Sequence, residues 1–234
     1  MEKLVNYFRD KEVASVVDVG TGGGDFITVL KDVFPKAQII GVDPDRESLK
    51  EAANKYPNVS FTEMRGENLE FADKSFDVAS ISMALHHLPD IQSALMEMQR
   101  VIKPGGWIIV NELFSDNLNP AQEVHKMFHH FRSLIDRLTG TFHQETFQKE
   151  QILQLVKAAG IQIQLSFEDN TQTNVLTKEG ELEMRVEKMK QHLEKIKGRP
   201  EYETLKPEID KFRERALKYG FQPATRVVVI GSSE

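Results

Sequence analysis

The sequence of 234 residues contains no cysteine, no long basic run, and no apolar stretch of the ~18 residues that a membrane span needs. The missing cysteine excludes disulfides, thiolate metal sites and a cysteine nucleophile. No membrane segment is predicted, and residues 1–12 lack the apolar stretch of a signal peptide, so a cytoplasmic location is expected. The net charge of −6 argues against a nucleic-acid partner, which normally meets a basic face.

Short apolar runs, typical of buried parallel strands, alternate with helical patterns along the chain. Strands are predicted at residues 13–19, 38–42, 59–64, 76–82, 107–110, 161–167 and 226–230. Helices are predicted at residues 1–11, 26–33, 45–55, 90–102, 119–138 and 147–159. The first of these helices places Leu4, Val5 and Phe8 on one side. The alternation predicts an α/β fold with a parallel, doubly wound sheet.

A glycine-rich segment, VVDVGTGGGDF (16–26), joins the first strand to the following helix. Glycines let the backbone turn tightly and approach a ligand closely, and a helix N-terminus offers free N–H groups to the same space. The dinucleotide pattern G-x-G-x-x-G fails, because Asp25 or Ile27 stands at the third glycine position. A phosphate-binding P-loop also fails, because no GK[ST] follows. The segment therefore predicts a nucleotide-type pocket of another kind.

Two acidic residues accompany the glycine loop. Asp18 precedes the loop, where a carboxylate would repel a pyrophosphate but attract a cation such as an ammonium or a sulfonium. Asp43 ends the second strand, where its carboxylate can accept hydrogen bonds from both ribose hydroxyls. The alternative interpretation is an ordinary strand-to-helix turn with an unrelated acid.

Four motifs occur in order over about residues 13–112: DVGTGGG (18–24), IIGVDPD (39–45), GENLEFADKSFDVASISMALHHL (66–88) and VIKPGGW (101–107). Together they resemble the class I S-adenosylmethionine-dependent methyltransferases. The resemblance is to the group that includes ubiquinone/menaquinone C-methyltransferases and many small-molecule enzymes. It implies a Rossmann-like doubly wound sheet of seven strands, the last one antiparallel, with S-adenosylmethionine as cofactor.

The resemblance also implies a role for each matching residue. The methionine portion of the cofactor would contact Gly20 and Gly22, with Asp18 nearby, and the backbone of Ser82. The ribose would contact Asp43. The adenine would contact Pro44, Gly66, Glu67 and Asn68. One position departs from the family pattern, because Arg65 stands where an Asp often accepts from the adenine amino group. Arginine cannot accept a hydrogen bond, so Glu67 or Asn68 would substitute, or the backbone alone would contact the adenine.

We expect one methyltransferase domain over residues 1–234, with its core in residues 12–112, 147–168 and 224–232. Insertions at 113–146 and 170–222 leave the sheet at its cofactor edge and are predicted to form the substrate pocket and a lid. The second insertion contains two helical patterns, at 182–196 and 205–216, that predict an antiparallel hairpin. The alternative roles of this hairpin are structural packing and a homodimer contact.

Titratable residues expected near the cofactor edge are candidate general bases. They are His87, Glu112, His125 and His129. His125 and His129 are four residues apart, so they share one helical face and could bind a metal with Glu123 or His143. The spacing fixes no third ligand, so no metal site is assigned, and polar pocket lining is the simpler interpretation.

The predicted activity is methyl transfer from S-adenosylmethionine to O, N, C or S of a small, partly apolar molecule by in-line displacement. The chain lacks the [ND]-P-P-[YF] motif of amino-group methylases, and ISMALHHL stands in its place. A methyltransferase acting on RNA or protein is the first alternative. A module that binds S-adenosylmethionine without turnover is the second, and a nicotinamide oxidoreductase is the remotest.

Overall fold

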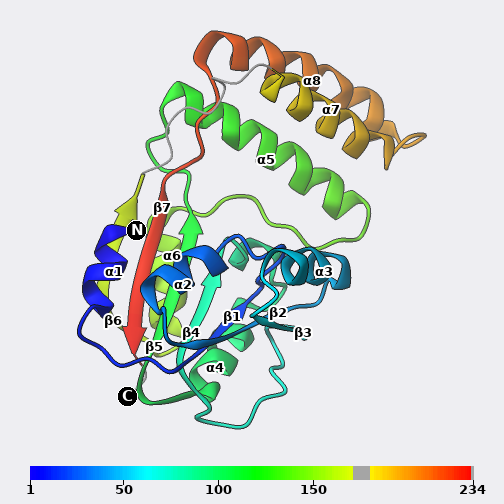
Figure 1. Ribbon diagram of the computed structural model, residues 1–234. Helices are drawn as coiled ribbons and strands as arrows, with labels where there is room; N and C mark the ends of the chain where they lie inside the picture. The colour runs from blue at the N-terminus through cyan, green and yellow to red at the C-terminus, as the bar shows by residue number, and fades with distance from the viewer. Residues whose placement is uncertain (171–179, 233–234) are drawn as a thin grey trace. The chain divides into compact units, whose positions relative to one another are not determined.

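The computed structural model describes residues 1–170 and 180–232. Its strands form one seven-stranded sheet in the order β3-β2-β1-β4-β5-β7-β6 (Figure 1). The strands are β1 (Ser15–Val19), β2 (Gln38–Asp43), β3 (Ser60–Glu63), β4 (Phe76–Ser82), β5 (Ile102–Leu113), β6 (Gln162–Asp169) and β7 (Arg226–Ser232). Strands β1 to β5 pair in parallel, whereas β7 runs antiparallel to β6. The predicted Rossmann-like sheet with an antiparallel last strand is confirmed.

The chain divides into two compact units. The sheet unit comprises Met1–Glu112, Glu150–Asp169 and Arg226–Glu234, and the helical unit comprises Leu113–Lys149 and Asn170–Thr225. The predicted insertion 170–222 includes residues 171–179, which lie outside the described residues. The α-helices are α1 (Glu2–Phe8), α2 (Ile27–Val33), α3 (Arg46–Lys55), α4 (Ile91–Val101), α5 (Pro120–Leu138), α6 (Lys149–Ala158), α7 (Glu181–Glu194) and α8 (Pro200–Tyr219).

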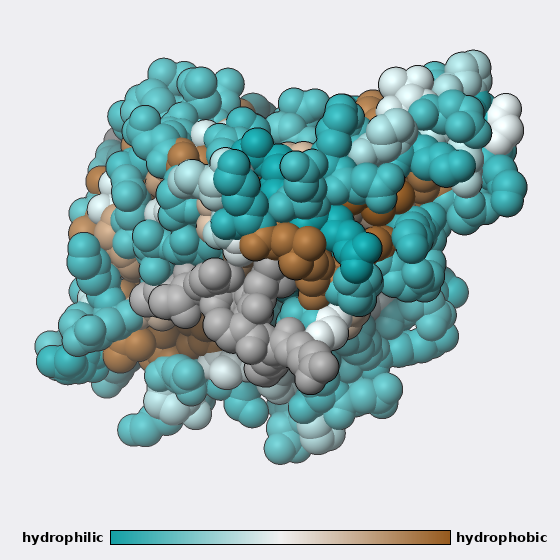
Figure 2. Space-filling model, turned by 90° about the horizontal axis from the view of Figure 1, so that it is seen from above, coloured by the Kyte–Doolittle hydropathy of each residue, from teal (hydrophilic) through white to brown (hydrophobic). Residues whose placement is uncertain are grey.

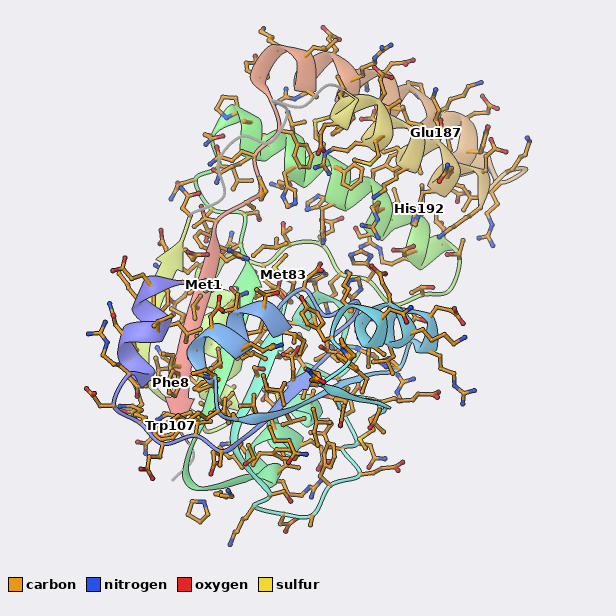
Figure 3. All side chains as sticks on the ribbon, in the orientation of Figure 1. Met1, Phe8, Met83, Trp107, Glu187 and His192 are labelled. Atoms are coloured by element: carbon orange, nitrogen blue, oxygen red, sulfur yellow. The ribbon has the colours of Figure 1, made fainter. Side chains whose placement is uncertain are left out.

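The core of the sheet unit includes the contact of α1 and α2 with one face of the sheet. Leu4 and Phe8 are buried, and the Phe8 ring meets Trp107 edge-on with the centroids 5.5 Å apart (Figure 3). Val5 was predicted on the same side, but 37% of it is exposed. Leu4 and Phe8 are four residues apart and share a face, whereas Val5 is rotated by about 100° from Leu4.

The helix predicted over 90–102 is shorter than expected. It begins after Asp90, whose carboxylate accepts from the Ser93 N–H at 3.0 Å, and it ends at Val101. Ile102 already pairs with Phe76 as the first residue of β5. Gly105 lies in β5 between the residues that pair with β4, Ile102 and Trp107, and has a φ of +75°, a conformation that glycine adopts without strain.

The helical unit is built on α5, α7 and α8. Asn119 caps α5 in a reciprocal capping box with Gln122. The apolar stripes of the two hairpin helices are buried against α5, as the three- and four-residue steps predict. Their buried members are Val186, Met189, Leu193 and Ile196 from α7 and its end, and Leu205, Ile209, Phe212 and Ala216 from α8. The predicted helical hairpin is confirmed.

None of the helices in the described part of the chain combines the length and the apolar character that crossing a membrane requires. On the face drawn in Figure 2, hydrophilic residues predominate and hydrophobic ones are gathered in a few patches.

Candidate functional site

The glycine loop turns sharply between β1 and α2. Gly20, Gly22 and Gly24 have φ values of +66°, +51° and +82°, in the left-handed region. The Thr21 N–H donates to the Val42 carbonyl at 3.0 Å, which ties the loop to the end of β2. A Cβ on Gly20 would lie 2.6 Å from the Cβ of Ala84, so the loop packs directly against the segment that follows β4. Glycine therefore stands at the three positions of this loop where the backbone has a positive φ.

Two alanine substitutions separate the cost of a steric clash from the cost of a positive φ. Gly20→Ala is expected to destabilise the fold by about 3 kcal/mol, because a positive φ and a steric clash add. Gly22→Ala meets no atom within 4 Å, so only the φ cost of about 1–2 kcal/mol is expected. Urea unfolding of both variants measures the difference. Equal losses of stability would contradict the clash at Ala84.

Asp43 holds the loop from the end of β2. One carboxylate oxygen accepts from the Gly22 N–H at 2.9 Å, and the other accepts from the Asp45 N–H at 2.9 Å. Burial raises the pKa of Asp43, while these two backbone hydrogen bonds oppose the rise. An ionised carboxylate has about four lone-pair sites, so acceptor capacity remains for two ribose hydroxyls.

Asp18 lies buried beneath the loop, with 1% of its surface exposed. Its Oδ1 accepts from the Ser80 hydroxyl at 2.7 Å. Its Oδ2 is buried and has no hydrogen-bond partner among the described residues. Burial raises the pKa of Asp18 from 3.8 to about 6, against the hydrogen bond from Ser80. A buried acceptor without a donor is costly, and a cationic or N–H-bearing ligand would satisfy it.

The ends of β4 and β5 add a second acceptor. Asn111 donates from Nδ2 to the Ser82 hydroxyl at 2.8 Å, and its Oδ1 is buried with no partner in the described chain. Met83, the first residue after β4, has a φ of +55°, which is uncommon for a residue with a side chain. Its N–H donates to the Asn111 carbonyl at 2.8 Å. Asn111 was not predicted from the sequence. A polar residue at the carboxyl end of an apolar strand was the available signal.

The loop after β3 has Arg65 at the position where the family pattern often has an aspartate. Gly66 is buried, and a Cβ there would lie 3.0 Å from a methyl group of Val19. Glu67 Oε1 is buried without a partner in the described chain, whereas Asn68 and Pro44 are exposed. Of Glu67 and Asn68, which the sequence offers as acceptors in place of the aspartate, Glu67 has a buried oxygen that could accept a hydrogen bond from a ligand.

Glu112 is fully buried at the end of β5 and uses both carboxylate oxygens. One accepts from the Leu85 N–H at 3.0 Å, and the other lies 3.0 Å from Nδ1 of His86. Its carboxylate therefore fixes the short 3₁₀ turn that contains both residues. His87, the histidine singled out from the sequence, is exposed, whereas 4% of His86 is exposed. The sequence shows two adjacent histidines, His86 and His87, but only the structure shows that a carboxylate orients His86.

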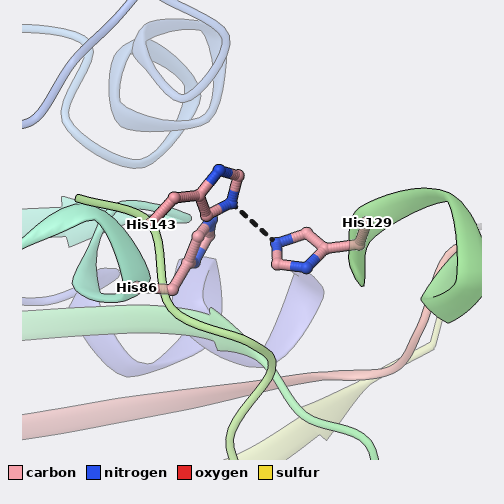
Figure 4. A group of neighbouring side chains, drawn as sticks. All are labelled: His86, His129 and His143. Atoms are coloured by element: carbon pink, nitrogen blue, oxygen red, sulfur yellow. Dashed lines mark hydrogen bonds between the residues drawn. The ribbon is translucent and has the colours of Figure 1, made fainter. Parts of the chain in front are cut away.

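The other two candidate bases belong to the helical unit. His125 Nδ1 accepts from the Ala224 N–H at 3.2 Å, and burial, with the positive charge of Arg185, lowers the pKa of His125 to about 4. This imidazole is neutral at pH 7. His129 and His143 approach with their Nε2 atoms 3.3 Å apart (Figure 4).

Asp136 links two histidines of the helical unit. Its carboxylate lies 2.7 Å from Nδ1 of His143 and 2.7 Å from Nε2 of His192. Burial raises the pKa of Asp136, but the hydrogen bonds from the two histidines outweigh it and hold that pKa well below its usual range. The network joins α5, α7 and the segment after α5.

Replacing Asp136 by asparagine is expected to destabilise the protein by about 3 kcal/mol at pH 7, because a largely buried charged network loses its anion. Since the folded-state pKa is lowered, this contribution is complete above the ordinary value of 3.8 and is lost as the pH falls from there toward the lower pKa of the folded state. Urea unfolding at pH 7 and at about pH 2.5 checks both statements. Asp210→Asn, on the exposed side of α8, is the matched control and should change stability by less than about 0.5 kcal/mol. Equal effects of the two substitutions would contradict the assignment.

Comparison with known proteins agrees with this geometry. Residues 17–110 match the family model described as Methyltransferase domain. A demethylmenaquinone methyltransferase of Chlorobaculum parvum is 30% identical over 176 residues, covering 69% of this chain and 71% of that protein. The crystal structure of the YcgJ protein from Bacillus subtilis superposes with a TM-score of 0.60 at 19% identity, covering 100% of this chain and 97% of the other. A geranyl diphosphate methyltransferase in complex with S-adenosylmethionine gives a TM-score of 0.57 at 12% identity, covering 100% and 84%.

The sheet order, the glycine loop and these matches define the class: the protein is an S-adenosylmethionine-dependent methyltransferase of class I. The site fits this cofactor, because buried acceptors at Asp18 and Asn111 lack donors and the cofactor carries an ammonium group. Within the class, the chain belongs to the family of the ubiquinone/menaquinone C-methyltransferases.

Proposed function

We propose that this methyltransferase methylates a small, partly apolar molecule, and that a reduced demethylmenaquinone-type naphthoquinol is the first acceptor to test. The Chlorobaculum parvum relative, named a demethylmenaquinone methyltransferase, supports this choice because the similarity covers 69% of the chain. The observation that carries the cofactor assignment is the buried, donor-free Oδ2 of Asp18 beside the glycine loop.

When bound, S-adenosylmethionine supplies an electrophilic methyl group on a sulfonium. In the proposal, Asp18 and Asn111 accept from its ammonium group, Gly20 and Gly22 line the methionine portion, and Ser82 offers backbone atoms to the same end. Asp43 accepts from the ribose. Adenine contacts are proposed for Pro44, Gly66, Glu67 and Asn68, with Glu67 Oε1 as the acceptor in place of the aspartate absent at Arg65.

The proposed general base is His86, held by Glu112. A carboxylate only accepts hydrogen bonds, so Nδ1 of His86 carries the proton and the basic lone pair lies on Nε2. A carboxylate behind an imidazole fixes its tautomer and the orientation of its ring. The turn that carries His86 also contains Ala84, which packs against Gly20 of the cofactor loop. The geometry favours this pair over His87, His125 and His129 as the base.

Replacing His86 by asparagine is expected to lower kcat about 10²-fold, the usual loss when a general base is removed, with little change in KM. Glu112→Gln should lower kcat less and shift the His86 tautomer, which ¹⁵N NMR reports without any acceptor. His87→Asn is the matched control and should retain kcat within about threefold. An unaltered kcat and pH profile in His86→Asn would remove this base from the proposal.

The experiment for the function uses the intact chain and methyl-labelled S-adenosylmethionine. After cofactor binding is measured by calorimetry, the protein is incubated with the reduced naphthoquinol and, separately, with cell extract fractionated by size. Label in the naphthoquinol or in the small-molecule fraction supports the proposal. Label confined to RNA or protein, or cofactor binding without formation of S-adenosylhomocysteine, would overturn it in favour of one of the two alternatives.

The helical unit is proposed to hold the acceptor, since its segments join the chain directly after β5 and β6, at their carboxyl ends. A homodimer through the α7–α8 hairpin and a cytoplasmic location stay predictions of the sequence. Light scattering of the purified chain tests the first of these.

A further inference from the structure

The helical unit contains a pocket of about 320 Å³. One stripe of α5 forms a long wall, and α8 forms the opposite one. From Glu123 to Arg137 this stripe runs fourteen residues, or about 21 Å of helix. The pocket is therefore elongated, and all of its lining residues belong to the helical unit.

The floor of the pocket is apolar. It consists of Met127, Phe131, Leu134, Met189, Leu205 and Phe212. Four of these, Phe131, Met189, Leu205 and Phe212, are buried members of the bundle core. Protein interiors are packed as densely as organic crystals, so an opening of this size in a small bundle is not ordinary packing. Its volume lies at the lower end of the range of small-molecule sites. Methionine side chains are flexible and adapt to the shape of a ligand.

The rim is polar but carries no excess of positive charge. Three carboxylates, those of Glu123, Glu145 and Glu208, accompany the cations of Lys126 and Arg137. Arg137 forms an ion pair with Glu145 at 3.3 Å, and Glu208 forms an ion pair with Lys211 on the same helix. With Lys211 counted, the three carboxylates meet three cations, so the rim offers an anion no net attraction that would offset its loss of hydration.

His130 gives the rim a neutral hydrogen-bonding group. Burial lowers the pKa of His130, so its imidazole is uncharged at pH 7 and has one donor and one acceptor nitrogen. Its Nε2 lies 3.1 Å from the Thr146 hydroxyl. An apolar slot with a few convergent polar groups is typical of a site for a small organic molecule.

We infer that the helical unit binds, in this pocket, a neutral, elongated and largely apolar molecule that carries one or two hydrogen-bonding groups. The walls determine shape and apolar character, and the rim provides no net positive charge to hold an anion. Ligand binding by the helical unit is measured separately from methyl transfer and does not depend on turnover of the proposed acceptor.

Two fluorescent probes with the same aromatic body test the class of ligand. N-phenyl-1-naphthylamine is neutral, and 1-anilinonaphthalene-8-sulfonate adds one sulfonate. Titration of the folded, full-length protein is expected to give saturable binding of the neutral probe, at least tenfold tighter than binding of the sulfonate. The neutral probe should also raise the melting temperature. Failure of the neutral probe to bind, or a preference for the sulfonate, would overturn the inference.

A pair of Leu→Trp substitutions tests the location. Leu134 lines the pocket, whereas Leu217 on α8 is 71% exposed and lies outside it. Leu134→Trp should weaken binding of the neutral probe at least tenfold, and Leu217→Trp should leave it unchanged. Met127→Trp, at a second partly buried lining position, should reproduce the loss if Leu134→Trp does not melt cooperatively. Parental affinity in a folded lining variant would place the probe elsewhere and contradict the proposal.

Discussion

Replacing Asp43 by asparagine is expected to weaken S-adenosylmethionine binding about 10³-fold. The proposed ribose contact consists of two hydroxyls donating to an ionised carboxylate, and each such charge-assisted bond contributes about 1.5–3 kcal/mol. The amide also turns an N–H toward the backbone donor of Gly22 or Asp45, which now meets an acceptor at 2.9 Å. Isothermal titration of the folded variant measures the loss.

The control for Asp43 is a second aspartate that accepts from a backbone N–H. Asp90 caps α4 and takes no part in the proposed cofactor contacts. Asp90→Asn should change stability by no more than about 1 kcal/mol, the typical contribution of an N-cap, and leave cofactor affinity unaltered. If Asp43→Asn bound the cofactor within tenfold of the parent, Asp43 would serve only to shape the glycine loop.

Asp18→Asn is expected to make the cofactor-free protein more stable and the cofactor complex weaker. Burial raises the pKa of Asp18 from 3.8 to about 6, so the folded state binds the proton more tightly than the unfolded state. The contribution of protonated Asp18 is complete below pH 3.8 and is lost as the pH rises through about 6. At pH 7 ionised Asp18 therefore costs about 3 kcal/mol, which the neutral amide removes.

Ionisation of Asp18 is also expected to control the affinity for S-adenosylmethionine. The ammonium group pairs with ionised Asp18, so affinity should fall about tenfold per pH unit below pH 6. Asp18→Asn should abolish this pH dependence and lower affinity at pH 7 about 10²-fold. Calorimetry from pH 5 to pH 8 and urea unfolding measure both effects.

Ser80→Ala provides a test of the cause. Its hydroxyl favours the ionised form of Asp18, so its removal should raise the pKa of Asp18 and move the fall in affinity to higher pH. Affinity of the parent protein that stays constant between pH 5 and pH 8 would contradict the pairing of Asp18 with the ammonium group.

Local sequence patterns predicted the sheet and its connections well. The strand Phe76–Ser82 has the predicted bounds, because a continuous apolar run next to charged turns marks a buried parallel strand. The hairpin helices also follow directly from apolar steps of three and four residues. Errors are confined to ends and single side chains. Val5 is exposed, and the helix predicted to Ile102 ends one residue earlier because Ile102 pairs with β4.

Spacing along the chain does not show which candidate bases interact. The sequence predicts His87 and Glu112 as separate candidates, whereas the Glu112 carboxylate contacts Leu85 and His86. Asn111 was missed, although its buried Oδ1 lies at the end of β5. These facts depend on which side chains long-range packing brings together, and spacing along the chain does not contain them.

By itself, the sequence determined the fold class, the glycine loop and the two aspartates beside it. Each of these depends on local rules: apolar periodicity, the conformational freedom of glycine and the position of an acid at a strand end. Only the tertiary structure decided which carboxylates have spare acceptors, which histidine a carboxylate orients, and that three helices leave a pocket between them. The physical reason is that burial and hydrogen-bond partners come from residues distant in sequence, and these set the charge state and availability of a side chain.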